Sequence, residues 1–391
     1  MRVHVTLGGD RVEIERGVFV ALLDNSVASE RAAYRHALED GEIKFTELVE
    51  IARVGNIPLP LFFAPLAVVE AQLDLKLGKL LDGLTKISFS LNARDPVRLS
   101  DIELILKDLI RKQQMLKKHD PTLGKNTIVG SLSKRGKSIE ADAARLVDLL
   151  GITDDTIRAA PKKDTAVDRL IRRLEANQVL VSQSQNLFMP QRLHGIHFSG
   201  MTVRDPKVPY IFLPSGDEGE HVAPAGRRTF TLTLLAVLVA RGIFAPVNYD
   251  STAPATTGRY EYDVAAEILM PAAEFTGFRP RTLADFEAVA DEFRVTPSAT
   301  IVRALRLNLI DDVTAGAHLA ELRAAFATIP NRPRNPSKPV NAVRKYNGRE
   351  LSRRMIRALD DGRLSAGDFC REVCLNNLAP GDIEEFRRGL P

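Results

Sequence analysis

A run of apolar residues extends from Phe230 to Ala240 and is interrupted only by two threonines. Gly242 follows shortly after it, and glycine is the residue that most often ends a helix. A membrane-spanning helix needs about 20 apolar residues, so this run is too short to cross a bilayer. The pattern therefore predicts a buried helix. A buried strand also fits, because threonine, valine and leucine occur in both.

Elsewhere, the spacing of apolar and polar residues predicts mainly helices. Apolar residues recur every three or four positions through most of residues 66–180, as they do in helices that bury one face. Residues 3–15 alternate around a glycine turn and predict a hairpin. Residues 179–182 and 207–215 predict further strands. We therefore expect an α+β protein that is mostly helical and contains a small sheet.

The segments on either side of the apolar run occur in an order that resembles a known family. A strand-like segment, Val208–Ser215, precedes the run, and Ala265-Ala-Glu-Ile-Leu-Met-Pro271 follows it. This order resembles the ImmA/IrrE family of zinc-metallopeptidase-like proteins. In that family a strand leads to R-x-F-T-L-A-H-E-x-x-H and later to F-A-A-E-L-L-M-P. The resemblance implies a small sheet-and-helix peptidase-like domain over residues 179–328.

The residues that carry the chemistry of that family are replaced in this chain. When Thr233 is placed on the first histidine of the family's H-E-x-x-H, Leu234 and Val237 take the positions of its glutamate and its second histidine. Two histidines four residues apart on a helix hold zinc, and the glutamate activates the bound water. The family's third ligand, a glutamate, falls on Gly258. The resemblance thus implies a packing helix, with no cofactor, no metal and no enzymatic activity.

A zinc metallopeptidase with relocated ligands is the enzymatic alternative, and it would have to use other histidines. His194 and His197 lie in a further strand-like segment before residues 207–215, and His221 is the histidine nearest to the altered motif. Two residues three apart in a strand point to opposite faces of the sheet, which disfavours a shared metal. One further histidine cannot replace a site with three ligands.

A stretch near the N-terminus resembles the second half of an Xre-type helix-turn-helix domain. Residues 28–38 and 45–53 predict two helices separated by a turn. No clear scanning helix precedes them, so the head, residues 1–66, is expected to be a degenerate helix-turn-helix domain. In the position of the recognition helix, Arg31 and Arg35 are candidates for DNA contact; a solvated helix face explains them equally well.

A proline-rich linker and a basic helical tail follow the peptidase-like domain. Four prolines predict an extended linker at residues 329–340, and residues 341–391 are expected to form a helical tail that reaches away from the body. A helical connector, residues 67–178, joins the head to the peptidase-like domain. Contact with nucleic acid or with an acidic partner is one interpretation of the clustered cations, and a solvated helix face is the other. The cations are Arg332, Arg334, Lys338, Arg344, Lys345, Arg349, Arg353, Arg354 and Arg357.

Composition adds little to this picture. The chain has 391 residues, 54 lysines and arginines against 50 acidic residues, and a net charge of +4, which is too small to indicate nucleic-acid binding by itself. Its first residues contain no apolar core of a signal peptide, and Cys370 and Cys374 are expected to be core thiols. We expect a cytoplasmic location and no membrane segment.

Known members of this layout are regulators, and many resemble antitoxins that pair with PIN-domain ribonucleases. The resemblance therefore implies a non-catalytic, antitoxin-like protein that binds and inhibits a partner, a PIN-type nuclease toxin above all. A DNA-binding transcriptional repressor and the peptidase with relocated ligands remain as alternatives.

Overall fold

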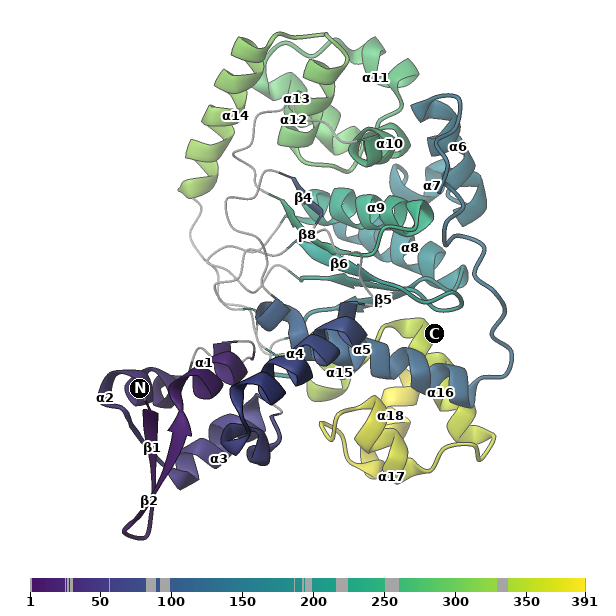
Figure 1. The fold of residues 1–391 in the computed structure, drawn as a ribbon. Coiled ribbons are helices and arrows are strands. Elements are labelled where there is room, and N and C mark those ends of the chain that lie inside the picture. Colours follow the sequence, from purple (N-terminus) through teal and green to yellow (C-terminus); the bar gives the residue numbers. More distant parts are fainter. Residues whose placement is uncertain are drawn as a thin grey trace. The chain divides into compact units, whose positions relative to one another are not determined.

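The computed structural model of this protein divides the chain into two compact units (Figure 1). The first comprises residues 1–83 and 97–108, and the second comprises residues 84–96 and 109–391. The first unit therefore includes all of the predicted head and the start of the predicted connector. The structure describes residues 2–24, 26, 28, 31–55, 57–81, 89–91, 99–185, 187–191, 193, 199–215, 224–249, 260–328 and 337–390.

The first unit is built around a small sheet with strand order β2-β1-β3. The predicted hairpin is confirmed, because β1 and β2 are antiparallel and Val5 lies opposite Val12. Gly8 and Gly9 form the turn with φ of +56° and +101°, a conformation that glycine adopts without strain. The unit contains β1 (Arg2–Leu7), β2 (Asp10–Glu15), α1 (Arg16–Asp24), α2 (Ala32–Asp40), β3 (Glu42–Lys44), α3 (Phe45–Val54), η2 (Leu59–Phe63), α4 (Leu66–Leu81) and the first half of α5 (Leu99–His119).

Both helices predicted in the head are present. The helix predicted over residues 45–53 is α3. The other, α2, begins four residues later than predicted because Arg31 has an extended backbone and takes the N-cap position. The four residues between α2 and α3 include β3, which pairs with β1 in the sheet. The likeness to a helix-turn-helix domain therefore stays a prediction.

The second unit contains a mixed five-stranded sheet with strand order β4-β8-β6-β7-β5. The strand β6 is antiparallel to both of its neighbours, whereas β5 is parallel to β7 and β4 is parallel to β8. The two strands predicted over residues 179–182 and 207–215 are β5 and β7. The strands are β4 (Phe89–Leu91), β5 (Leu180–Gln183), β6 (Gly200–Val203), β7 (Tyr210–Leu213) and β8 (Pro246–Tyr249).

Helices make up most of the second unit, so the chain is an α+β protein that is mostly helical, as the sequence predicted. None of the helices that the structure describes is long and apolar enough to cross a membrane. Besides the second half of α5, the helices are α6 (Ile139–Leu150), α7 (Asp154–Ile157), α8 (Lys163–Ala176), α9 (Ala225–Arg241), α10 (Tyr260–Leu269), α11 (Ala272–Phe278), α12 (Leu283–Glu292), α13 (Pro297–Arg306), α14 (Asp312–Ala327), α15 (Pro339–Asn347), α16 (Arg349–Asp360), α17 (Ala366–Asp368), η3 (Phe369–Val373), η4 (Pro380–Asp382) and α18 (Ile383–Arg388).

The apolar run from Phe230 to Ala240 lies within α9, at the centre of the second unit. The prediction of a buried helix is confirmed, since every residue from Thr231 to Ala240 is buried. The helix contacts β6 and β7 of the sheet and the helices α8 and α10. Gly242 ends it with φ of +73°. Burial of each large aliphatic side chain of this run contributes about 1.5–3 kcal/mol to folding.

The C-terminal tail packs against the second unit, so the expectation that it reaches away from the body was wrong. The helix α15 contacts the edge strand β5, where the Ser182 hydroxyl donates to the Tyr346 carbonyl at 2.6 Å. Val340, Val343 and Tyr346 recur every three residues along α15 and are 6%, 2% and 1% exposed. This apolar stripe explains the packing, because an extended tail would leave it in water.

Candidate functional site

The helix that we aligned with the family's zinc-binding motif is α9, and the three aligned positions lie in the core. Thr233, Leu234 and Val237 are at most 2% exposed. The Thr233 hydroxyl donates to the carbonyl of Thr229 at 3.0 Å, so its hydrogen bond stays within the helix. Leu234 and Val237 belong to the main hydrophobic cluster of the unit. These positions pack the fold together, and Gly258 lies outside the described residues.

The glutamate of the A-A-E segment, Glu267, also has a structural role. Its carboxylate accepts the N–H of Ala272 at 3.1 Å, at the start of α11, and pairs with the guanidinium of Arg303. Arg303 donates in addition to the carbonyl of Met270 at 3.1 Å. Both charged side chains are more than 90% buried. This bonded pair therefore fixes α10, α11 and α13 to one another.

The structure brings together few residues of the kind that bind metals. Within the described ranges there is no group of three or more histidine, cysteine, aspartate or glutamate residues that could hold a metal ion. His194, His197 and His221 lie outside those ranges. Cys370 and Cys374 are both buried, and burial raises the pKa of Cys374 to about 12, which keeps its thiol protonated. These two cysteines are core thiols, as predicted.

The basic tail residues are positioned by a sharp elbow between α15 and α16. Gly348 forms this elbow with φ of +80°, and a Cβ atom there would lie 2.4 Å from the carbonyl oxygen of Val181 in β5. The next N–H, that of Arg349, donates at 3.0 Å to the carboxyl of Glu175 in α8. Only glycine fits this approach without strain, so the elbow places α16 beside α8.

Glu175 of α8 has a buried carboxyl group that lies against the start of α16. Burial raises its pKa to about 7, with the nearby Glu350 carboxylate adding to the rise and the backbone N–H groups of Glu350 and Arg349 opposing it. Its Oε2 atom is buried and has no hydrogen-bond partner among the described residues. The contact between the tail and α8 therefore contains an acid that titrates close to neutral pH.

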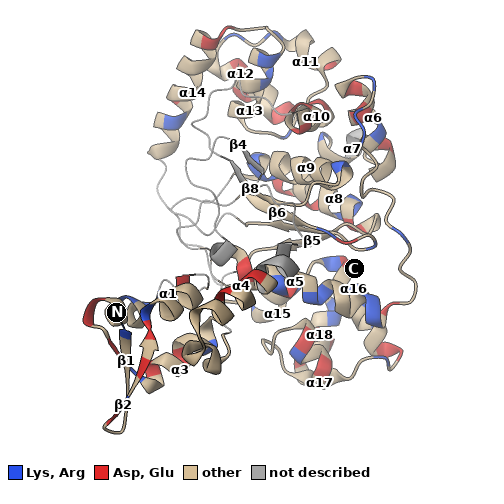
Figure 2. Ribbon diagram, in the orientation of Figure 1, with Lys and Arg blue, Asp and Glu red and all other residues tan. Residues whose placement is uncertain are grey.

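The cations of α16, coloured blue along the ribbon in Figure 2, differ in exposure and in partners. Arg354 is only 14% exposed in its side chain and bonds to Asp120 and to Glu350, each at 2.6 Å. Burial alone would raise the pKa of Asp120, but hydrogen bonds from Thr122 and Arg354 lower it below its usual value. The Arg353 side chain is 52% exposed and pairs with Glu350. Arg354 thus binds within the fold, whereas Arg353 faces solvent.

Three predicted tail cations line a basic groove together with two cations of the body. Arg344, Lys345 and Arg349 come from α15 and α16, and Arg172 and Arg228 come from α8 and α9. The groove has a volume of about 430 Å³. In this basic groove the structure brings three of the contact residues predicted from the sequence into one site.

The basic groove keeps an excess of positive charge. Asp164 and Asp168 are its acidic residues, so five cations against two carboxylates leave three positive charges. Arg228 pairs with Asp164, whereas Arg172 and Arg349 form no ion pair with any described residue. A groove of this kind attracts carboxylates and phosphates, and planar guanidinium groups bind both through paired hydrogen bonds.

No sequence pattern singled out the two body cations of the groove. Arg172 and Arg228 lie in Arg-Arg pairs at residues 172–173 and 227–228. Such pairs are common on solvated helices, and nothing in the sequence places them beside residues more than 100 positions further on. The elbow at Gly348 creates this proximity, and only the fold reveals it.

The two candidate residues of the head lie in the other unit. Arg31 and Arg35 are exposed at the start and middle of α2, while Tyr34 between them is buried and donates to Asp24 at 2.6 Å. The two arginines therefore occupy a solvated helix face, which is the arrangement that both interpretations of them require. Their contact with DNA stays a prediction.

Comparisons of this chain with protein-family models, with curated proteins and with solved structures found no match. The features described above therefore rest on the chain's own residues and geometry.

Proposed function

We propose that the protein is a non-catalytic, antitoxin-like regulatory protein that binds and inhibits an acidic partner protein. The expected partner is a PIN-type ribonuclease toxin. The basic groove carries this proposal, because it gathers five cations in a chain whose net charge is only +4. Buried aliphatic residues at the motif positions of α9 support a role without catalysis. We place this activity in the cytoplasm.

The chemistry of the groove suits such a partner. The active site of a PIN-type nuclease is a cluster of carboxylates that holds Mg²⁺ or Mn²⁺. Arginines that pair with those carboxylates would compete with both the metal and the RNA. Arg172, Arg344, Lys345 and Arg349 are our contact candidates. Arg354 is withdrawn from this role, since it already bonds to two carboxylates of its own chain.

Coexpression with the product of the neighbouring open reading frame tests the proposal. We expect the two proteins to copurify and the parent chain to restore growth when the neighbour is toxic. The double variant Arg172→Glu and Lys345→Glu should lose both effects, because it places carboxylates against an acidic partner. The matched control reverses Lys134 and Arg145, two exposed cations outside the groove, and should behave as the parent.

Point variants are preferable to truncation here. Removal of residues 329–391 would uncover the surface of β5 that α15 covers, so loss of function would not report on the groove. A harmless neighbour, or a double variant that copurifies as well as the control, would exclude the groove as the inhibitory contact.

A DNA-binding regulator is the second candidate, and the exposure of Arg31 and Arg35 is compatible with it. Each phosphate contact releases counterions, so specific binding should weaken steeply as salt is raised. Arg31→Glu with Arg35→Glu should weaken it further. A DNA affinity that changes neither with salt nor with these substitutions would exclude this candidate.

A further inference from the structure

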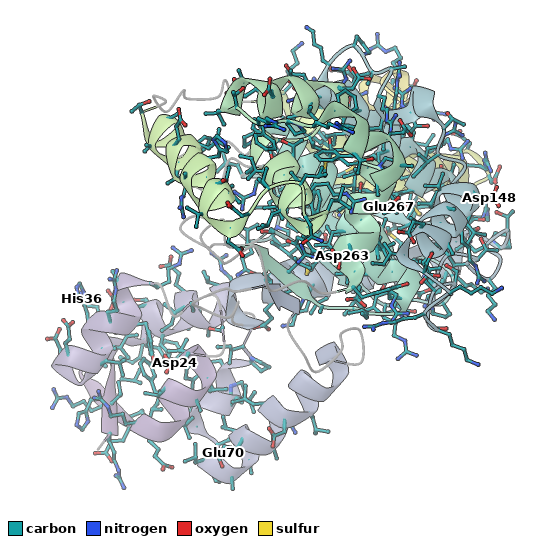
Figure 3. The ribbon with its side chains drawn as sticks, turned by 90° about the horizontal axis from the view of Figure 1, so that it is seen from above. Asp24, His36, Glu70, Asp148, Asp263 and Glu267 are labelled. Atoms are coloured by element: carbon teal, nitrogen blue, oxygen red, sulfur yellow. The ribbon has the colours of Figure 1, made fainter. Side chains whose placement is uncertain are left out.

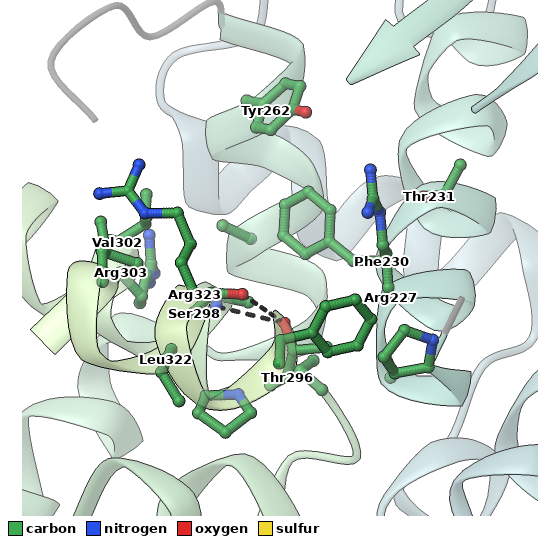
Figure 4. A pocket seen from close by; sticks show the side chains of 18 of the residues that line it. Arg227, Phe230, Thr231, Tyr262, Thr296, Ser298, Val302, Arg303, Leu322 and Arg323 are labelled. Atoms are coloured by element: carbon green, nitrogen blue, oxygen red, sulfur yellow. Dashed lines mark hydrogen bonds between the residues drawn. The ribbon is translucent and has the colours of Figure 1, made fainter. Parts of the chain in front are cut away.

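The second unit holds another cavity, which we call the apolar pocket (Figure 4). It has a volume of about 470 Å³ and lies between the start of α9 and the helices α10, α13 and α14. Its walls are mostly apolar, and a volume of this size accommodates a drug-sized ligand. The apolar walls include Phe230, Ala266, Val302, Leu319, Leu322 and Phe326.

The apolar face of α14 forms one wall of this pocket. Leu319, Leu322 and Phe326 recur at three- and four-residue spacing, which places them on one side of the helix. Leu319 and Leu322 are half-buried, and Phe326 is still 39% exposed. A ligand with an apolar body would remove this surface from water, and that removal favours binding.

Positive charge is concentrated in the lining of the pocket. Five of its lining residues are cationic (Lys163, Arg227, Arg303, Arg306 and Arg323), and one is acidic (Asp263).

Several of these cations are already neutralised. Arg306 pairs with Asp263, and Arg303 pairs with Glu267. The two acidic residues come from α10 (Figure 3). Lys163 pairs with Asp291. Arg323 of α14 is exposed and has no ion pair with any described residue. Arg323 therefore offers its guanidinium to a ligand beside the apolar wall of α14, on the same helix.

We propose that the apolar pocket binds a small anionic amphiphile, a single carboxylate or sulfonate head group on an apolar body. The apolar walls would hold the body, and Arg323 would bind the head group through a charge-assisted hydrogen bond. A ligand with several phosphates fits less well, because Lys163, Arg303 and Arg306 are already paired with carboxylates. This inference is independent of the proposed function, since the basic groove shares none of these residues.

Titration of the full-length protein with decanoate tests the inference, with calorimetry as the readout and decanol as the uncharged comparison. We expect saturable binding of about one decanoate per chain, with decanol binding at least tenfold more weakly. Arg323→Glu should weaken decanoate binding by at least tenfold while leaving decanol binding unchanged. Val302→Phe, which fills a half-buried position of the wall, should weaken the binding of both.

Arg145→Glu is the charge-matched control and should bind decanoate as the parent does. A parent chain that shows no saturable binding would overturn the proposal. Equal affinity for decanoate and decanol, or decanoate binding that Arg323→Glu does not weaken, would overturn it as well. Should Val302→Phe lower the melting temperature markedly, Arg323→Glu remains decisive, because that side chain is exposed. None of these outcomes bears on copurification with the neighbouring gene product.

Discussion

The helices α9 and α16 show how differently apolar and charged patterns report on structure. An apolar run marks α9, and the structure buries every residue from Thr231 to Ala240. Clustered arginines mark α16, yet their exposure to solvent and their partners differ. Arg354 is enclosed between two carboxylates, and its neighbour Arg353 faces solvent.

The difference follows from the physics of the two interactions. Apolar burial needs no particular partner, because any apolar surface removes a leucine from water. An ion pair needs a specific partner at a specific distance. For Arg354 that partner is Asp120, which lies 234 residues earlier in the chain. Sequence spacing therefore predicts buried helices well and predicts the role of individual charges poorly.

The largest effect is expected from a charge placed in α9. Val237→Asp should destabilise the protein by roughly 4 kcal/mol or more, because Val237 is fully buried in the apolar cluster and a carboxylate there would lose its hydration. Val237→His should cost less at pH 8, since imidazole is neutral there. Urea unfolding of the variants measures both costs. Equal stability of Val237→Asp and the parent would show that α9 is exposed.

A smaller loss is expected when the enclosed cation of α16 is removed. Arg354→Met should destabilise by roughly 2–4 kcal/mol, because it leaves Asp120 and Glu350 buried without their shared cation. Urea unfolding at pH 7 gives this value directly. A change below about 0.5 kcal/mol would mean that Arg354 is solvated like its neighbour.

The buried acid beside the elbow predicts an unusual pH dependence. The folded pKa of Glu175, about 7, lies above the ordinary value of 4.5, so folding favours the protonated form. Its stabilising contribution is complete below about pH 4.5 and is lost as the pH rises to 7. Glu175→Gln should therefore be more stable than the parent at pH 8, by roughly 2 kcal/mol, and equally stable near pH 5. Parallel pH profiles of the two proteins would contradict this.

The smallest effect is expected at the neighbouring arginine. Arg353→Met should change the free energy of unfolding by less than about 1 kcal/mol, because half of its side chain is in water and surface ion pairs contribute little. The Arg353→Met variant serves as the control for Arg354→Met, because both substitutions lie on α16 and are measured in the same denaturant series. Similar losses for the two variants would remove the contrast between enclosed and solvated cations.

Much of the fold followed from the sequence, for reasons that particular elements illustrate. The hairpin of residues 3–15, α3 and α9 were predicted because alternation, helical spacing and a glycine stop act locally. The packing of the tail was missed, although Val340, Val343 and Tyr346 show the stripe that buries α15. The proline-rich segment before it predicts an extended linker, and a helix packed on the sheet follows that segment only in the fold.

The candidate sites were predicted less completely. Arg344, Lys345 and Arg349 were identified from their charge, but Arg172 and Arg228 were not. The apolar pocket was not predicted, because its walls come from four helices and no motif connects them. Sites that depend on distant segments meeting in space leave no local signal.

The central claim is that α9 is a packing helix in a protein that binds no zinc, and metal content tests it most directly. Elemental analysis of the full chain, purified without chelator, should find far less than one zinc per protein. About one zinc per chain, lost when His194, His197 or His221 is replaced by alanine, would contradict the claim and support a peptidase with relocated ligands.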